Sequence, residues 1–235
     1  MNSFILLFVI PFAVLLPAYI RAERQTGVQG EVRGEAQGGF RKAMVLKLAL
    51  SGLCSLCAVL GFAFWAAQGD LSRVFVVAAL LCAIPGDCYL QFVGLDEKKF
   101  NKGIFWFAIT QYFLIQFLYL LYGFSWLEFA IAVIVCVGAY LLVIRPGQGP
   151  SQTRVSLTAY TFLLALMASK AVIALFGAAT PTLPVSLMAA GAVLFALSDL
   201  LQGIKLSKPG DWPLYHLNLI VYFCGLLLIA LSTNF

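Results

Sequence analysis

The chain has 235 residues, of which 62% are hydrophobic and only 11% are charged. Soluble domains carry about 25% charged residues, so the composition excludes a soluble globular protein and indicates a single integral membrane domain over residues 1–235. The net charge of +5 does not indicate a nucleic-acid partner, because the basic residues are spread over short loops, as topology signals are.

Eight segments are apolar enough and long enough to cross a bilayer, which takes about 20 residues. In chain order they are Ser3–Ile20, Met44–Ala67, Ser72–Phe92, Gly103–Tyr122, Ser125–Ile144, Val155–Leu175, Pro184–Ile204 and Leu214–Leu231. The predicted fold class is therefore all-α, a polytopic membrane helical bundle with eight transmembrane helices.

The charged residues predict how this bundle is oriented. A cleavable signal peptide carries basic residues before its apolar run. No Lys or Arg precedes the first span, so we expect that span to remain in the protein as a helix. The odd-numbered loops hold most of the basic residues, and the even-numbered loops hold only Arg73. Because basic loops face the cytoplasm, both termini are predicted to lie outside, in a membrane that we expect to be the bacterial inner membrane.

Two carboxyl groups lie inside the predicted spans. Asp87 belongs to the third span and Asp199 to the seventh, and both are expected in the cytoplasmic half of the membrane. An ionisable group in hydrocarbon is costly and by default marks a functional site. Two carboxyls at matching depth suggest one shared site for acid and base chemistry.

The positions of the two carboxyls also suggest an internal duplication. They are 112 residues apart (199 − 87) and occupy the third and seventh of eight spans. The halves, about 1–122 and 125–235, would then be parallel four-helix repeats, and membrane proteins often build their sites between repeats.

Further polar residues lie in the spans near the predicted level of the carboxyls. The candidates for substrate binding are Lys47, Gln111, Tyr160, Asn218 and Tyr222. Each of them alone is also explained by hydrogen bonding between helices.

Familiar cofactor and nucleophile motifs are missing from the chain. It has one histidine, no phosphate-binding loop and no G-x-S-x-G motif, so we expect no metal and no cofactor. Cys54 and Cys57 form a C-x-x-C, but with no second pair and no nearby histidine we interpret them as packing residues. The chemistry that remains is that of two carboxyls with different protonation states. Such a pair could hydrolyse a vinyl ether through an oxocarbenium-like cation, as glycosidases do with acetals.

Several short motifs are similar to those of a known family. They are Lys47-Leu, Gly86-Asp87, Phe100-Asn-Lys-Gly103, Gly191-Ala-Val-Leu-Phe-Ala-Leu-Ser-Asp199 and Tyr222-Phe. Over Lys47 to about Ser232 the chain resembles the YhhN-type lysoplasmalogenases, which have eight spans. It departs from that family at Gln111, where many members carry histidine.

The resemblance implies hydrolysis of the vinyl ether of a lysophospholipid, lysoplasmalogen, to a fatty aldehyde and glycerophospho-ethanolamine or -choline. It also implies that Asp87 and Asp199 are the catalytic pair, supported by Lys47, Tyr160 and Tyr222. Two alternatives stay open on the residues alone. One is a proton-coupled carrier of a small or lipid-like substrate, since carriers also use intramembrane carboxyls. The other is a non-catalytic membrane protein, in which both carboxyls would be paired with lysine or backbone groups.

Overall fold

The computed structural model describes residues 2–28, 36–90, 96–145, 151–177, 180, 182–207 and 212–235, and all regular structure in these ranges is helical. The helices are α1 (Asn2–Val28), α2 (Ala36–Ala66), α3 (Val74–Leu90), α4 (Glu97–Tyr122), α5 (Trp126–Ala139), α6 (Ser151–Gly177), α7 (Leu183–Ser207) and α8 (Trp212–Leu231). A π-helical segment, Tyr140–Ile144, continues α5, and a 3₁₀ turn, Ser232–Asn234, follows α8. The predicted all-α class is confirmed, with one helix for each predicted span.

Seven of the eight helices are long and apolar enough to cross a membrane. The exception is α3, which has 17 residues in the described part of the chain. The predicted third span, 72–92, ends among residues 91–95, which lie outside the described ranges. The protein is therefore an integral membrane helical bundle, in which α5 reaches membrane length together with its π-helical continuation.

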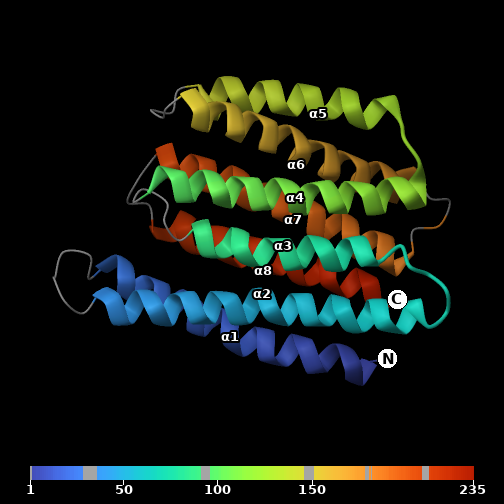
Figure 1. The fold of residues 1–235 in the computed structure, drawn as a ribbon, viewed down its shortest axis with the longest axis horizontal. Coiled ribbons are helices and arrows are strands. Elements are labelled where there is room, and N and C mark those ends of the chain that lie inside the picture. The colour runs from blue at the N-terminus through green and yellow to red at the C-terminus, as the bar shows by residue number, and fades with distance from the viewer. Residues whose placement is uncertain are drawn as a thin grey trace.

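The helices run side by side along one direction (Figure 1). In Figure 1, α2, α3 and α4 lie next to one another, with α1 beyond α2 and the α5–α6 pair beyond α4. Helices α7 and α8 pass behind them, and α8 has the largest buried share of all the membrane-length helices. The core thus forms where α7, α2, α1 and α3 pack around α8.

Close packing of α7 on α8 depends on a pair of glycines. A Cβ atom added to Gly191 would lie 2.8 Å from the carbonyl oxygen of Gly225, and one added to Gly225 would lie 3.0 Å from the carbonyl oxygen of Gly191. Small residues let two helix backbones approach closely in a membrane. This contact holds the helix that carries Asp199 against the helix that carries Tyr222.

Helix α3 meets α4 at a second close approach. A Cβ atom at Gly86 would lie 2.9 Å from Cε2 of Phe107, so the Phe107 ring occupies the place where a larger residue would project. Gly86 precedes Asp87, and the contact therefore sets the position of that carboxyl relative to α4.

The order of helix packing matches what a parallel four-helix repeat requires. Helix α1 packs on α2, α2 on α3 and α3 on α4, and in the same way α5 packs on α6, α6 on α7 and α7 on α8. The contacts between the two halves are also equivalent. The fourth helix of the first half, α4, packs on the second helix of the other half, α6, and α8 packs on α2 in the same way. The division into halves at about residues 122–125 stays a prediction that this packing favours.

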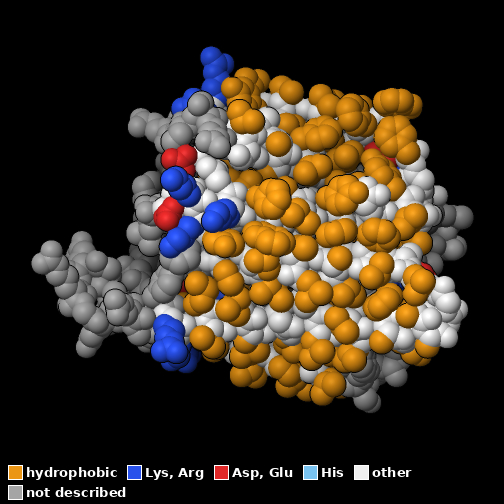
Figure 2. Space-filling view, viewed as in Figure 1, with side chains coloured by type: hydrophobic (Ala, Val, Ile, Leu, Met, Phe, Trp, Pro, Cys, Tyr) orange, Lys and Arg blue, Asp and Glu red, His pale blue; other side chains and the backbone are white. Residues whose placement is uncertain are grey.

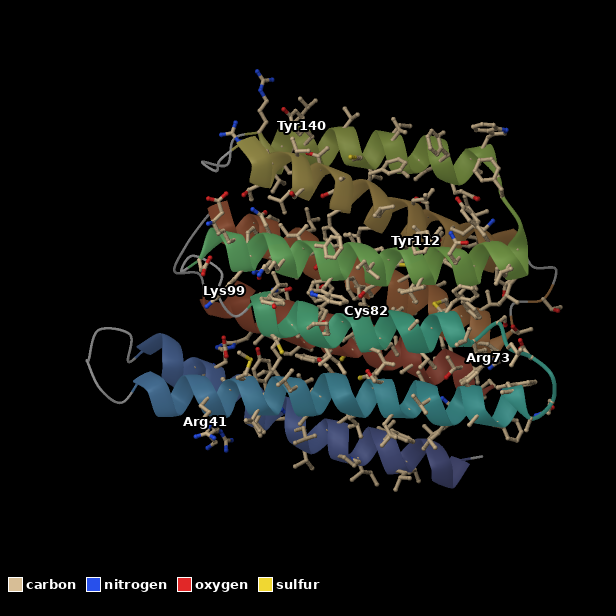
Figure 3. All side chains as sticks on the ribbon, viewed as in Figure 1. Arg41, Arg73, Cys82, Lys99, Tyr112 and Tyr140 are labelled. Atoms are coloured by element: carbon tan, nitrogen blue, oxygen red, sulfur yellow. The ribbon has the colours of Figure 1, made fainter. Side chains whose placement is uncertain are left out.

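Basic side chains gather at one end of the bundle, next to a broad hydrophobic surface (Figure 2). Arg41 and Lys99 lie at this end, whereas Arg73 lies at the other (Figure 3). Both chain termini are at the end that holds Arg73 (Figure 1). Of the basic loop residues, Arg33 and Lys208 lie outside the described ranges. The structure thus separates the charges as expected, while the assignment of the basic end to the cytoplasm stays a prediction.

Candidate active site

Asp87 is held by side chains from two other helices. Its carboxylate is 1% exposed, and Nζ of Lys47 on α2 lies 3.2 Å from its Oδ1. The other oxygen, Oδ2, accepts hydrogen bonds from the hydroxyl of Tyr222 on α8, at 2.9 Å, and from the hydroxyl of Ser51 on α2. One cation and two hydroxyl donors therefore converge on this carboxylate, and all of them stabilise its ionised form.

The local sequence explains why α2 supplies two of these three groups. Lys47 and Ser51 are four residues apart, so they lie one above the other on the same face of the helix. Both are buried, at 7% and 1% exposure. Ser51 was not among the predicted site residues. Its signal in the sequence is a polar residue one turn after Lys47 within an apolar run.

Asp199 has a different environment. The phenol of Tyr160 on α6 donates a hydrogen bond to its Oδ2. In the described part of the chain, none of the ion pairs includes Asp199. Gln111 of α4 lies beside Tyr160 and is fully buried. The neighbouring Ser198 side chain is a second neutral partner of this carboxyl. A buried carboxyl with neutral donors and no cation favours the protonated form over the ionised one.

The two carboxyls lie near enough to interact. Asp87 and Asp199 interact electrostatically with each other, and both interact with the phenol of Tyr222. The Tyr222 ring packs edge-on against Phe195 and Phe107, with centroid distances of 5.4 Å and 6.1 Å. These aromatic rings make the surroundings of the pair apolar, which strengthens charge interactions within it.

The partners of the carboxyls lie within one residue of corresponding positions in the two proposed repeats. Asp87 and Asp199 differ by 112 in number (199 − 87), and Lys47 and Tyr160 differ by 113 (160 − 47). Lys47 of α2 binds the carboxylate of α3, and Tyr160 of α6 binds the carboxyl of α7. One half thus places a cation against its carboxyl, and the other half places a neutral phenol there.

The structure brings four of the five predicted substrate-binding residues to the carboxyls and leaves one apart. Lys47, Tyr160 and Tyr222 contact them directly, and Gln111 adjoins Tyr160. Asn218 instead donates a hydrogen bond to Oε1 of Gln202 at 2.8 Å, which links α8 to α7. Bonding between helices explains Asn218, and the binding and catalytic roles of the other residues stay predictions.

A second buried ion pair lies away from the two aspartates. Nζ of Lys170 on α6 is 3.3 Å and 3.4 Å from the two carboxylate oxygens of Glu128 on α5. Glu128 also accepts a hydrogen bond from the backbone N–H of Ser125, in a capping box that begins α5. The pair and the cap together satisfy both buried charges, and they join α5 to the rest of the bundle.

A pocket of about 140 Å³ opens at the end of the bundle that holds Arg73. Its walls come from the α2–α3 loop, the ends of α4 and α6, the start of α7 and the 3₁₀ turn after α8. Neither aspartate lines it. This pocket is therefore separate from the two carboxyls.

The environments of the carboxyls bear on the non-catalytic alternative, which requires lysine or backbone partners for both. Asp87 meets this requirement through Lys47. Asp199 does not, since the partners described for it are the hydroxyl groups of Tyr160 and Ser198. A carboxyl kept in the bilayer without a countercharge is costly for a purely structural role.

Comparison with known proteins gives one match. The sequence model of the YhhN family matches residues 44–233, which include all the residues that contact the two carboxyls. No curated protein and no solved structure matches the chain.

Proposed function

This chain belongs to the YhhN family, and on that premise we propose that it hydrolyses the vinyl ether bond of lysoplasmalogens inside the membrane. The products are a fatty aldehyde and a glycerophospho-ethanolamine or -choline. The partners are then a lysophospholipid and water, and the reaction uses no cofactor.

The observation that carries the proposal is the unequal environment of the two carboxyls. Asp87 has an ammonium at 3.2 Å and two hydroxyl donors, so it stays ionised. Asp199 has a phenol and, in the described part of the chain, no cation, so it holds a proton. Pairs of titratable groups whose environments separate their protonation states are typical of acid and base assignments in enzymes.

The first step is protonation of carbon. Asp199 gives its proton to the alkenyl carbon that is not bonded to oxygen, and the electron pair of the double bond forms the new C–H bond. The other alkenyl carbon becomes part of an oxocarbenium ion. The Asp87 carboxylate stabilises this cation in an apolar site, where electrostatic stabilisation is strong.

The second step restores the enzyme. Water adds to the oxocarbenium carbon, and its proton passes to the Asp199 carboxylate. The resulting hemiacetal then collapses: its C–O bond to glycerol breaks, its hydroxyl proton moves to the leaving oxygen, and an aldehyde and an alcohol remain. Asp199 thus loses one proton and regains one in each cycle.

The test is release of fatty aldehyde from a lysoplasmalogen by the purified protein. We expect Asp199→Asn to lower kcat by about 100- to 10,000-fold, the usual contribution of a positioned acid. Asp87→Asn should also lower kcat strongly, because it removes the charge that stabilises the cation.

The control is Asp96→Asn. Asp96 caps α4 by accepting a hydrogen bond from the backbone N–H of Lys99 at 3.1 Å, and its side chain is 39% exposed. This variant should retain the wild-type rate. A double variant, Asp87→Asn with Asp199→Asn, that inserts into membranes and still works at full rate would refute the proposal.

A further inference from the structure

The pocket at the end of the bundle that holds Arg73 (Figure 3) is a feature that the proposed reaction does not use. It has a volume of about 140 Å³, and neither aspartate lines it. A cavity of about 150 Å³ with apolar walls is large enough to bind benzene, so this pocket has room for an apolar group of about six carbon atoms. Pockets between the helices of a bundle are common places for small ligands.

The pocket is polar at its mouth and apolar deeper in the bundle. The polar residues lie at the ends of elements: Arg73 belongs to the α2–α3 loop, Tyr122 ends α4 and Thr182 directly precedes α7. Among the apolar lining residues, Phe117 lies five residues before the end of α4 (122 − 117) and Met188 five residues after the start of α7 (188 − 183). At 1.5 Å per residue these two side chains are about 7 Å deeper, and both are buried. An occupant therefore meets polar groups at one end and hydrocarbon at the other.

The charges at the mouth are already paired. Nε of Arg73 lies 3.4 Å from Oδ2 of Asp70, and the other two nitrogens of the guanidinium donate hydrogen bonds to oxygen atoms of Thr233 and Phe235. Asp70 and Arg73 are the charged residues that line the pocket, so their net charge is zero. A charged ligand would lose hydration on entry without gaining a countercharge, and the pocket therefore favours an uncharged one.

Two hydroxyl groups at the mouth can bind the polar end of such a ligand. The phenol of Tyr122 and the hydroxyl of Thr182 have no hydrogen-bond partner among the described residues, and both residues are exposed. Each hydroxyl can donate one hydrogen bond and can also accept. An alcohol or aldehyde oxygen accepts from such groups and carries no charge.

We propose that this pocket binds a short, uncharged amphiphile, an alcohol or an aldehyde whose apolar part has about six carbon atoms. The apolar part packs against Phe117 and Met188, and the oxygen accepts hydrogen bonds from Tyr122 and Thr182. Because the pocket is separate from the paired carboxyls, this inference does not depend on the proposed hydrolysis.

The experiment is photolabelling of the purified protein in lipid nanodiscs with a hexanol that carries a diazirine in its chain. Mass spectrometry of the peptides locates the label, and we expect saturable labelling of the α4 and α7 peptides that contain Phe117 and Met188. Unlabelled hexanol and hexanal should displace the probe. Near neutral pH, hexanoate and hexylammonium should compete at least about 10-fold less well, because each would bring an unpaired charge into the pocket.

Two variants test the two parts of the pocket. Ala174 lines the pocket, and Ala174→Leu fills part of it, so this variant should bind the probe at least about 10-fold more weakly. The matched control is Ala63→Leu, at an exposed position of α2 outside the pocket, which should label like the wild type. Tyr122→Phe combined with Thr182→Val removes both hydroxyls, and it should weaken hexanol binding about 2- to 13-fold for each hydrogen bond lost without changing the binding of hexane.

Labelling that does not saturate, or that is unchanged in Ala174→Leu, overturns the inference. Displacement by hexane as effective as that by hexanol also overturns it, because that result identifies a site for hydrocarbon alone, such as the end of a lipid chain. Displacement by hexanoate as effective as that by hexanol contradicts the uncharged head. If Ala174→Leu does not fold, the displacement series on the wild type and the variant without the two hydroxyls still decide the question.

The labelling experiment separates this inference from the proposed function. Asp199→Asn should label like the wild type, because Asp199 does not line the pocket. A protein that releases no aldehyde from lysoplasmalogen but labels as described retains the inference and loses the hydrolase. A protein that releases aldehyde but shows no saturable labelling retains the hydrolase and loses the inference.

Discussion

Lys47 is the residue on which the ionised state of Asp87 depends. Its side chain is 9% exposed, and its ammonium faces the carboxylate of Asp87, whose side chain is 1% exposed. Charges buried in this way are stable only as a pair, since each alone loses its hydration without compensation. The same pair therefore supports both the fold and the proposed chemistry.

Replacing Lys47 with methionine tests this dependence. We expect Lys47→Met to lower the free energy of unfolding by about 3–5 kcal/mol, because it leaves a buried carboxylate without a partner. Lys47→Met combined with Asp87→Asn should recover most of the loss. The measurement is unfolding in mixed detergent micelles.

A surface pair supplies the comparison. Lys99 and Asp96 are 3.8 Å apart and are 43% and 39% exposed, so Lys99→Met should cost less than about 1 kcal/mol. If Lys47→Met has as small an effect as Lys99→Met, the buried pair does not stabilise the protein as described.

The sequence identified the carboxyls but not the details of their contacts. Asp87 and Asp199 were predictable because charge inside an apolar run is rare. Ser51 was missed because one serine in a membrane helix is common and acts only through a partner 36 residues away. The depth of Asn218 matches that of the carboxyls, but its direction around α8, toward Gln202, depends on packing and could not be predicted.

Helices α7 and α8 bring Asp199 and Tyr222 into the same site through a contact that tolerates no added atom. The Gly191–Gly225 approach leaves no room for a Cβ on either helix. The position of Asp199 relative to Tyr222 therefore depends on this close helix packing and not on a loop.

Two glycine substitutions separate packing from helix propensity. Gly191→Ala should lower the free energy of unfolding by about 1–3 kcal/mol, because the new methyl group overpacks the contact with α8. Gly52→Ala on α2, where a Cβ would meet nothing within 4 Å, should raise stability by about 0.5–1 kcal/mol through helix propensity. The measurement is thermal unfolding of both variants. Equal effects of the two substitutions on stability would contradict the described α7–α8 contact.

The predicted elements agree with the observed ones because transmembrane helices have a strong signal in hydropathy and length. Helix boundaries were harder to predict. Helix α4 begins at Glu97 rather than Gly103 because Asp96 caps it, and the cap lies in a polar stretch beyond the apolar run. The contact partners of α6 also depend on tertiary packing, which hydropathy does not reveal.

Charge is distributed unevenly over the whole molecule. Basic side chains gather at the end opposite the termini (Figures 1 and 2), and both carboxyls belong to helices that run toward the basic end. Under the positive-inside rule that end faces the cytoplasm, so we propose that both termini face outward.

Cysteine labelling tests this orientation. In a protein whose native cysteines are replaced, Gln68→Cys in the α2–α3 turn should react with a membrane-impermeant maleimide on intact cells. Lys99→Cys at the basic end should react only after the membrane is permeabilised. The reverse pattern would invert the proposed topology.

The most direct test of the central claim, that a buried carboxyl delivers a proton to carbon, is hydrolysis of lysoplasmalogen in D₂O. The account predicts that the aldehyde released by the wild type carries one deuterium on the carbon next to its carbonyl. The free aldehyde, incubated for the same time in the same solvent, should remain unlabelled, and Asp199→Asn should produce almost no labelled product. Aldehyde formed without deuterium, or formed with deuterium at an undiminished rate by Asp199→Asn, would contradict the account.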